Sequence, residues 1–452
     1  MKILVCVKII KGEINPFDQS ALECALQLSD DVTVISMGAE SCEEVLKPLT
    51  RLGAKVKLIS DRAFAGSDTL ATSYILSSVI KTMEYDLIIC GRQSVDGDTA
   101  QTGPMLAQWL GLPIECGVMS AEYKDSSLNI KSRTEDKAIK LPALITVERG
   151  YILRFPSIFS KLSDIDILNS NDFECDIDRC GLNGSPTRVL KSFENEQGKR
   201  HCKFITMNEL FPLIDKLMKK MPNELDVTDT KSAKRLNSVW AVGDEVYESA
   251  SRIADEVISI EKSSAEEIAR RARQEKPKVI LWNADEWGRK TAAAAAVILN
   301  TGLCADCTAL ETDGEQLFMY RPAQGGNITA KIKCLTTPSM ATVRTKSECS
   351  DIIVSGGKGV RQSMDKLKEL AQRLNAQLGA SRGLVDMNAV PYDLQIGLTG
   401  KTVSPKVYIA IGISGAVHHT CAIEGSNTVI AINPDKNARI FEYADYGIVA
   451  EF

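Results

Sequence analysis

Short apolar runs alternate with longer amphipathic segments over the first ninety or so residues of the chain. The runs KILVCVKII, DVTVISMG, KVKLIS and YDLIICG are separated by SALECALQL, CEEVLKPLTRLGA and DTLATSYILSSVIKTM. A strand buried on both faces gives a continuous apolar run, whereas an amphipathic helix gives apolar residues every three or four positions. The order strand, helix, strand therefore predicts a parallel sheet with helices on both faces.

The same alternation returns twice further along the chain. One region begins at SVWAVGDEVYESASRIADEVISI, and the next has strands that run into glycine, in DIIVSGGKG, VYIAIGISGAVHH and TVIAINPD. The stretch PNELDVTDTKSAKRLN is polar, begins with proline and lacks periodicity, as an interdomain linker does. We therefore expect an α/β fold with three doubly wound parallel-sheet domains. The predicted bounds are 1–221, 238–347 and 348–452, with a linker over 222–237.

Composition excludes several classes of partner. The 452 residues exceed what one hydrophobic core accommodates, so several domains are expected. The net charge is only −5 and no run of basic residues occurs, which argues against nucleic acid and anionic membranes as partners. The longest apolar stretch, 291–299, is half of what a bilayer span requires, and the N-terminus turns polar early. We expect a cytoplasmic protein without membrane insertion.

The cysteines predict no metal site. Thirteen cysteines without short fixed spacings are typical of reduced thiols in a cytosolic protein. Cys304 and Cys307 have CxxC spacing, but no second pair or suitably placed histidine completes a ligand set. Most of these thiols are expected to pack in cores.

Three glycine-containing loops, at 91–104, 355–359 and 412–419, each follow an apolar run and precede helix-like sequence. Exposed amides at a helix N-terminus attract anions, and glycine lets a ligand approach the backbone. The first strand lacks a G-x-G-x-x-G fingerprint and the chain lacks a P-loop, so a phosphate site here has another geometry. The chain has three histidines, His201, His418 and His419, and neither G-x-S-x-G nor H-E-x-x-H, which disfavours a hydrolase.

Longer motifs resemble one protein family. Residues 379–452, from GASRGLVDMNAVPYDLQIGLTG through VYIAIGISGAVHH to the end, resemble the FAD domain of the electron-transfer flavoprotein alpha subunit. The first 220 residues resemble its beta subunit, through CVK, INPFD, SDRAFAGSDTLATSYIL and GRQSVDGDTAQTGP. The chain thus resembles a beta subunit fused to an alpha subunit. The resemblance implies a redox carrier in which electrons pass between FAD and a partner dehydrogenase.

The resemblance implies an FAD site in the last domain. By motif, Arg382 lies beside the flavin ring, Thr399 hydrogen-bonds flavin N5 and His419 reaches the C2 carbonyl. A cation and a hydrogen-bond donor there would stabilise negative charge on the ring. Lys358 stands where the family usually has arginine, which replaces a bidentate fork with a point charge. The other implied FAD contacts are Gly356, Gly357, Ser381, Gln395, Gly397, Gly400, Ser414, Gly415 and Asn433.

The beta-like half is implied to hold either AMP or a second FAD. The motifs DGDTAQTGP, TGLCADCT and RPAQGGN are similar to the electron-bifurcating branch, in which a second FAD accepts hydride from NADH and splits its two electrons. AMP-type members usually carry asparagine where this chain has Ala100, so the motifs favour FAD. The implied contacts are Cys6, Asn15, Met37, Gly38, Asp96, Gly97, Asp98, Thr99, Ala100, Gln101 and Thr102.

The segment ERGYILRFPSIFSKLSD corresponds to the family's partner-docking loop but lacks its usual basic run. In the family this loop carries an apolar anchor for an acyl-CoA dehydrogenase, and the candidates here are Ile158, Phe159 and Leu162. The alternative is that these side chains pack inward. The expected partners are a flavin-dependent dehydrogenase of the acyl-CoA type and, if the chain bifurcates electrons, ferredoxin or flavodoxin. The alpha-like region 238–347 is shorter than the family pattern, by a βα unit.

Three other interpretations stay open. One is a simple shuttle with one FAD and one AMP. Another is an adenine-nucleotide-binding regulatory protein that has lost its flavin function. The third is an NADH-dependent flavoenzyme acting on a small substrate, for which no acid-base set is evident.

Overall fold

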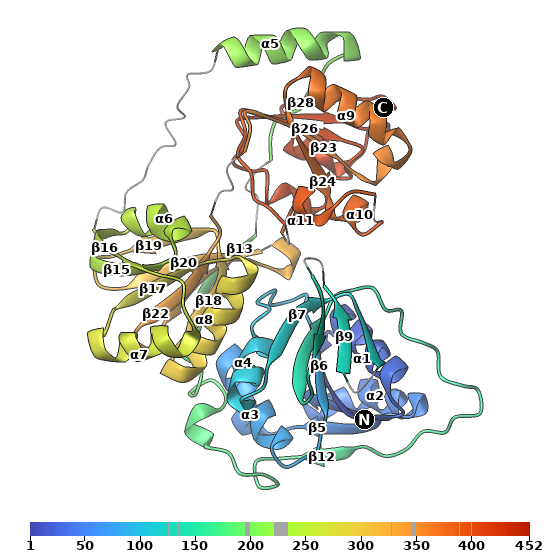
Figure 1. The fold of residues 1–452 in the computed structure, drawn as a ribbon, viewed down its shortest axis with the longest axis vertical. Coiled ribbons are helices and arrows are strands. Elements are labelled where there is room, and N and C mark those ends of the chain that lie inside the picture. The colour runs from blue at the N-terminus through green and yellow to red at the C-terminus, as the bar shows by residue number, and fades with distance from the viewer. Residues whose placement is uncertain are drawn as a thin grey trace. The chain divides into compact units, whose positions relative to one another are not determined.

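The computed structural model describes residues 1–452 except 125–126, 133–134, 195–198, 221–233, 327, 346–348, 388 and 399. The chain forms two compact units, which we call unit 1 and unit 2 (Figure 1). Unit 1 comprises Met1–Ser192, Lys231–Gln324 and Ala330–Val343. Unit 2 comprises Phe193–Thr230, Gly325–Thr329 and Arg344–Phe452.

The first sheet of unit 1 has seven parallel strands in the order β12-β5-β4-β1-β6-β11-β7. The continuous apolar runs are explained by helices on both faces: α1 (Pro16–Leu28) and α2 (Glu43–Leu46) cover one, α3 (Thr69–Ile80) and α4 (Thr102–Leu110) the other. The strands are β1 (Lys2–Val7), β4 (Asp31–Met37), β5 (Lys55–Ile59), β6 (Leu87–Gly91), β7 (Ile114–Val118), β11 (Ala143–Val147) and β12 (Asp166–Leu168).

Two antiparallel additions accompany this sheet. The hairpin of β2 (Ile9–Ile10) and β3 (Glu13–Ile14) precedes α1. A three-stranded sheet of β8 (Ser120–Lys124), β9 (Ser127–Lys131) and β10 (Asp136–Ile139) buries apolar side chains of β9 in the core on the α1 face.

The second sheet of unit 1 has five parallel strands in the order β16-β15-β17-β22-β18. Helix α6 (Tyr247–Ser251) covers one face, and α7 (Ala265–Glu275) and α8 (Glu286–Leu299) cover the other. Leu70 of α3 and Met105 of α4 share a core with α8, which joins the two sheets into one unit. The strands are β15 (Leu236–Val242), β16 (Ala254–Ile260), β17 (Val279–Asn283), β18 (Leu303–Cys307) and β22 (Ser339–Val343).

A four-stranded sheet, β13-β21-β20-β19, combines β13, which precedes the second parallel sheet in the chain, with three strands inserted between β18 and β22. Its strands are β13 (Thr187–Glu194), β19 (Ala309–Thr312), β20 (Leu317–Ala323) and β21 (Ile328–Cys334). Short 3-10 helices connect many of the elements: η1 (Glu40–Cys42), η2 (Lys47–Leu52), η3 (Arg62–Phe64), η4 (Ile177–Arg179), η5 (Met207–Glu209), η6 (Asp244–Val246), η7 (Gln324–Gly326), η8 (Lys358–Ser363), η9 (Tyr392–Leu394) and η10 (Arg439–Tyr443).

Unit 2 is built on a seven-stranded parallel sheet in the order β14-β28-β27-β26-β23-β24-β25. Helices α5 (Leu210–Lys220), α9 (Met364–Arg373) and α10 (Arg382–Val385) cover one face, while α11 (Val417–Thr420) and η10 lie toward the other. The strands are β14 (Lys203–Phe204), β23 (Ile352–Gly356), β24 (Gln377–Ser381), β25 (Gln395–Ile396), β26 (Val407–Ile411), β27 (Thr428–Ile432) and β28 (Tyr446–Ile448).

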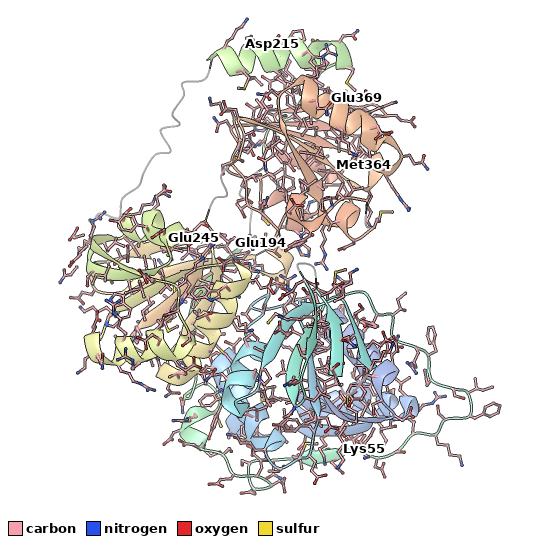
Figure 2. The ribbon with its side chains drawn as sticks, in the orientation of Figure 1. Lys55, Glu194, Asp215, Glu245, Met364 and Glu369 are labelled. Carbon is pink, nitrogen blue, oxygen red and sulfur yellow. The ribbon has the colours of Figure 1, made fainter. Side chains whose placement is uncertain are left out.

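Residues 203–220 belong to this second unit, although the sequence assigns them to the first region. Strand β14 pairs with β28, and Leu210 and Ile214 of α5 are buried in the core of unit 2. The green helix α5 accordingly lies beside the orange and red C-terminal elements (Figure 1), with exposed Asp215 labelled on it in Figure 2. The apolar stripe of α5 predicts that it buries a face but not which sheet receives that face.

The predicted fold class is confirmed, because three large parallel sheets are each covered by helices on both faces. The predicted domain bounds stay a prediction, and most of the predicted linker, 222–233, lies outside the described residues. Within the part of the chain that the structure describes, no helix is long and apolar enough to cross a membrane.

Candidate functional site

A cavity of about 940 Å³ lies in unit 1, beside the carboxyl ends of β1 and β6. Strands β4 and β5 extend the sheet on one side of β1, whereas β6 and β11 extend it on the other. The crevice where the strand order reverses is where open parallel sheets bind ligands. Cys6 and Cys90 are register partners on these two strands, and both line the cavity.

The predicted loop 91–104 forms one wall of this cavity. Asn15, which is buried, donates from Nδ2 to the Gln93 carbonyl (2.9 Å) and accepts from the Val95 amide (3.2 Å). Asp98 and Ala100 have positive φ angles of 52° and 53°, which turn the chain back toward the start of α4. The first amides of α4 therefore end at the cavity, as a phosphate site requires.

All but two of the predicted nucleotide contacts in this half line the cavity. The exceptions are Asp96, which accepts from Lys8 Nζ (2.7 Å), and Asp98, which accepts from Gln93 Nε2 (2.9 Å), so both shape the loop. The cavity-lining residues of the predicted set are Cys6, Asn15, Met37, Gly38, Gly97, Thr99, Ala100, Gln101 and Thr102.

The cavity also has walls that the sequence analysis missed. One is the loop after β5, another is β18 of the second parallel sheet, and a third is formed by β20 and β21 of the four-stranded sheet. The stretches SDRAFAGSD and RPAQGGN contain several of these residues and are among the motifs that carry the resemblance, so they held a usable signal. The missed lining residues include Asp18, Arg62, Phe64, Asp68, Thr69, Leu303, Cys304, Ala305, Arg321 and Ile332.

Arg321 places a buried cation on the cavity wall. Its side chain is held by the Ala305 carbonyl, which accepts from Nε (2.8 Å), and by the Gly97 carbonyl, which accepts from Nη1 (2.5 Å). The residue is only 4% exposed, and its Nη2 has no hydrogen-bond partner among the described residues. A buried N–H without an acceptor is costly, and the guanidinium brings positive charge to a wall of the cavity.

Asp18 is a buried acidic residue that lines the same cavity as the basic Arg321. Burial raises its pKa to about 7, although hydrogen bonds, including one from the Lys8 amide (2.7 Å), oppose the rise. The carboxyl is therefore substantially protonated near neutral pH and adds less negative charge beside an anionic ligand. Gly91 is required behind it, because a Cβ there would lie 2.2 Å from Asp18 Oδ1.

In unit 2 the corresponding switch point lies between β23 and β26, since the six C-terminal strands have the order β25-β24-β23-β26-β27-β28. The two predicted glycine loops meet there. The Gly357 amide donates to the Ile411 carbonyl (2.8 Å), and a Cβ on Gly357 would lie 2.1 Å from the Gly412 carbonyl oxygen. Such close backbone approach at strand ends suits a pyrophosphate.

Further predicted residues support these loops. Gly415 has φ +87°, and a Cβ there would lie 2.1 Å from the Ile440 amide nitrogen. Asn433 donates from Nδ2 to the Ile413 carbonyl (2.9 Å), which holds the second loop to β27. The Lys358 side chain lies against Gly383, the residue that follows Arg382.

The remaining predicted residues lie along the ends of neighbouring strands. Arg382 begins α10 and donates from Nε to Asp386 (3.2 Å). Gly356 and Ser381 end β23 and β24, Gln395 is buried in β25, Gly397 and Gly400 form the turn after it, and Ser414 follows β26. Thr399 lies outside the described residues.

His419 is engaged by the protein. Its Nδ1 lies 3.0 Å from the Ile396 carbonyl oxygen and its Nε2 lies 2.8 Å from the Tyr408 hydroxyl. Because a carbonyl only accepts, Nδ1 carries the proton and Nε2 accepts from Tyr408. Burial lowers the pKa of His419 to about 4. The ring has no N–H left over, so the predicted contact with a flavin carbonyl requires one of these bonds to open. His418, by contrast, is exposed.

The predicted docking side chains point into solvent. Ile158, Phe159 and Leu162 are 85%, 86% and 57% exposed, which contradicts the alternative that they pack inward. Ile152 and Phe155 of the same loop are also exposed, at 89% and 96%, and were missed. The docking role itself stays a prediction.

Cys304 and Cys307 are buried in β18, where Cys307 Sγ donates to the Cys304 carbonyl (3.7 Å). The described residues contain no group of three or more His, Cys, Asp or Glu side chains arranged to hold a metal ion.

Comparisons with known proteins agree with this arrangement. The family described as electron transfer flavoprotein domain matches residues 3–152 and 241–350, and the electron transfer flavoprotein FAD-binding domain matches 348–424. The electron transfer flavoprotein subunit alpha of Thermoanaerobacterium thermosaccharolyticum is 39% identical over 41% of this chain and 71% of its own length. The subunit beta of the same organism is 39% identical over 39% and 74%.

A further relative, the electron transfer flavoprotein subunit beta of Megasphaera elsdenii, is 34% identical over 49% of this chain and 98% of its own length. Similarity to both kinds of subunit within one polypeptide agrees with the resemblance to a fusion, and the FAD-binding domain falls on unit 2. The chain therefore belongs to the electron transfer flavoprotein family, with a beta-like half, an alpha-like half and a C-terminal FAD-binding domain.

Proposed function

We propose that this electron transfer flavoprotein holds a second FAD in the cavity of unit 1 and uses it to take electrons from NADH and divide them between two acceptors. The observation that carries the proposal is the extent of the cavity. It runs from the amides at the start of α4 to Leu303 of the second parallel sheet and Arg321 of the four-stranded sheet.

The size of the cavity favours a ligand longer than a mononucleotide. Pockets for whole drug-sized ligands have roughly 300–1,000 Å³, and about 940 Å³ is near the upper end of that range. AMP seated on the loop 97–103 would leave the walls at Leu303 and Ile332 uncovered. A flavin ring offers both an apolar face and carbonyl oxygens.

The roles of this chain's own residues follow from the geometry. The amides of Thr102 and Gly103 and the dipole of α4 would bind phosphate, and Arg321 would orient a polar edge of the ring. Phe64, Leu303 and Ile332 would exclude water. When bound, a flavin supplies both one-electron and two-electron transfer, which a carrier between NADH and single-electron partners needs.

In unit 2 the loops after β23 and β26 would hold the pyrophosphate of the first FAD. Lys358, which lies against Gly383, and Arg382, at the start of α10, would supply positive charge that favours an electron-rich flavin. The predicted contacts of Thr399 and His419 with the flavin belong to the same proposal.

The partners we propose are a flavin-dependent dehydrogenase of the acyl-CoA type, docking on the exposed side chains of 152–162, and ferredoxin or flavodoxin as the low-potential acceptor. Solvent-exposed aromatic and aliphatic side chains on a loop are typical of docking anchors. A cytoplasmic location is part of this proposal.

A carrier with one FAD and one AMP is the second candidate, because α4 and its loop by themselves offer a phosphate site. The deciding experiment is to purify the chain without oxygen, denature it, and count FAD and AMP per chain by chromatography. Two FAD and no AMP are expected; one FAD with one AMP would refute the second flavin.

A matched pair of variants locates that second flavin. Arg321→Met should weaken it by roughly 10- to 100-fold, the effect of losing a charged hydrogen bond, and leave one FAD per chain. Arg270→Met removes an exposed arginine that pairs with Glu267 and should leave both. Loss of both flavins in Arg321→Met would show that the two sites are misassigned.

A further inference from the structure

Two cysteines flank the 3-10 helix η4 in the segment between β12 and β13. The Arg179 amide donates to the Asp176 carbonyl (3.0 Å) and the Cys180 amide donates to the Ile177 carbonyl (3.0 Å), which folds the chain back on itself. Cys180 Sγ lies 3.3 Å from the Asp176 carbonyl oxygen, and Cys175 packs against the same apolar core cluster that contains Cys180. Each thiol also shifts the pKa of the other. A disulfide between them requires the two sulfurs to approach to about 2.05 Å.

The two thiols differ in access. Cys180 is 2% exposed and packs with Phe64 and Phe173, whereas Cys175 is partly exposed. A reagent from solvent therefore reaches Cys175 first, and Cys180 is placed to react with whatever is attached there. Burial raises the pKa of Cys175 and raises that of Cys180 to about 12. Since the thiolate is the reacting species, exchange at this pair accelerates as pH rises above neutrality.

The chain after Cys180 is fastened to the cavity wall of unit 1. The Gly181 amide donates to Ser67 Oγ (3.0 Å), the Asp68 amide donates to Ser185 Oγ (2.8 Å), and Thr187 Oγ1 donates to Asp68 Oδ2 (2.6 Å). A Cβ on Gly181 would lie 2.2 Å from the Ala63 carbonyl oxygen, so this side of the turn cannot shift inward. Cys175 is therefore the partner that moves, and a bond between the two sulfurs leaves the wall in place.

We propose that Cys175 and Cys180 are a redox modification site, at which a low-molecular-weight disulfide such as oxidised glutathione converts the dithiol into a reversible intramolecular disulfide. The Cys175 thiolate attacks the glutathione disulfide, forming a Cys175–glutathione bond and releasing one glutathione thiolate. The Cys180 thiolate then attacks the Cys175 sulfur, forming the protein disulfide and releasing the second. The protein loses two electrons and two protons, and one glutathione disulfide becomes two thiols.

The sequence provides a clean assay for this bond. Trypsin cleaves after Lys161, Arg179 and Arg188, so Cys175 and Cys180 fall on separate peptides, 162–179 and 180–188. The purified full-length protein is incubated at pH 8.5 with glutathione buffers of increasing oxidised fraction, alkylated, digested and analysed by mass spectrometry. We expect the two peptides joined, in proportion to the oxidised fraction, and separated again by dithiothreitol.

Variants identify the order of events. Cys180→Ser should accumulate glutathione on Cys175, and Cys175→Ser should leave Cys180 unmodified. Cys42→Ser removes another partly exposed thiol of unit 1 and should leave the joined peptides unchanged. Stable glutathione on Cys175 in the unaltered protein, a bond from either cysteine to a different one, or no modification up to pH 9 would each overturn the proposal.

Discussion

Arg200 fastens the segment 199–205 to the sheet of unit 2, and its removal should release that segment. Its guanidinium donates from Nη1 to Asp445 Oδ2 (2.5 Å) and to the Asn427 carbonyl (3.1 Å). Nη2 donates to the carbonyls of Ser426 (2.6 Å) and Glu424 (3.3 Å). One side chain thus satisfies a carboxylate and three backbone acceptors at the end of the sheet, and Arg200→Ala leaves all four without it.

The size of the effect follows from burial. Breaking a fully buried ion pair costs about 3–5 kcal/mol, whereas an exposed pair is worth about 0–1 kcal/mol. The side chain of Arg200 is 16% exposed and that of Asp445 is 34% exposed, so water replaces part of what is lost. We expect a cost of about 2–3 kcal/mol, which corresponds to a 30- to 150-fold rise in the opening equilibrium of this segment.

Amide hydrogen exchange measures that opening directly. The amides of Arg200, Lys203 and Ile205 donate to the carbonyls of residues 442, 445 and 447, at 2.7, 2.9 and 2.9 Å. In Arg200→Ala these amides should exchange 30- to 150-fold faster than in the unaltered protein. Amides of β1 in unit 1 should keep their rates, since nothing there contacts Arg200.

Arg200→Lys is the matched control, because it keeps the charge opposite Asp445 but loses the planar fork that reaches several carbonyls. It should accelerate exchange by less than about tenfold. If Arg200→Ala exchanges at the rate of the unaltered protein, then the apolar face of α5 holds the segment without help. Equal acceleration throughout unit 2 would instead mean that the segment and the sheet open as one body.

Two further predictions concern the proposed FAD site of unit 2. His419 has a folded pKa of about 4 against 6.5 when unfolded, so the unfolded chain binds the extra proton and stability falls as pH decreases from 6.5 to 4. Urea unfolding of unit 2, followed by flavin fluorescence, should show that the free energy of unfolding falls by about 1.4 kcal/mol per pH unit over this range. His419→Asn should abolish this pH dependence. The same slope in both proteins would mean that the ring is not buried as a neutral group. Gly415→Ala should expel the FAD of unit 2 because its Cβ would collide with the Ile440 amide, whereas Gly12→Ala, with a similar φ of +81° and nothing within 4 Å, should retain it. Flavin content after gel filtration distinguishes the two, and full retention in Gly415→Ala would show that its loop does not contact the cofactor.

The periodicity of apolar residues and the placement of glycines were enough to predict the fold class and to identify the loops that meet at the carboxyl ends of the strands. Continuous apolar runs require helices on both faces, and parallel strands place all their carboxyl ends at one edge. The meeting of Gly357 and Gly412 at the switch point follows from that rule alone. The loop 91–104 was predictable for the same reason.

Features that depend on long-range side-chain partners were not predictable from these patterns. The sequence shows His419 beside His418, but it does not show that Tyr408 and Ile396 occupy both ring nitrogens of His419. Likewise, RPAQGGN contains an arginine, but only the fold reveals that this residue lines the cavity and that its Nη2 is buried without a partner among the described residues. Hydrogen-bond satisfaction is a property of the assembled site, and a motif specifies it only through family precedent.

The assignment of residues 203–220 shows why fusion matters physically. In relatives named as separate alpha and beta subunits, the sequences that match this chain lie on different polypeptides. Here β14 extends the sheet of the alpha-like half and α5 packs on its face, while the chain before and after this segment belongs to unit 1. Attachment of this segment is therefore intramolecular, with an effective concentration that dilution does not change. Exchange of the amides in 199–205 should accordingly be independent of protein concentration, even in Arg200→Ala, whereas a rate that rises on dilution would mean that the segment is supplied by a second copy of the chain.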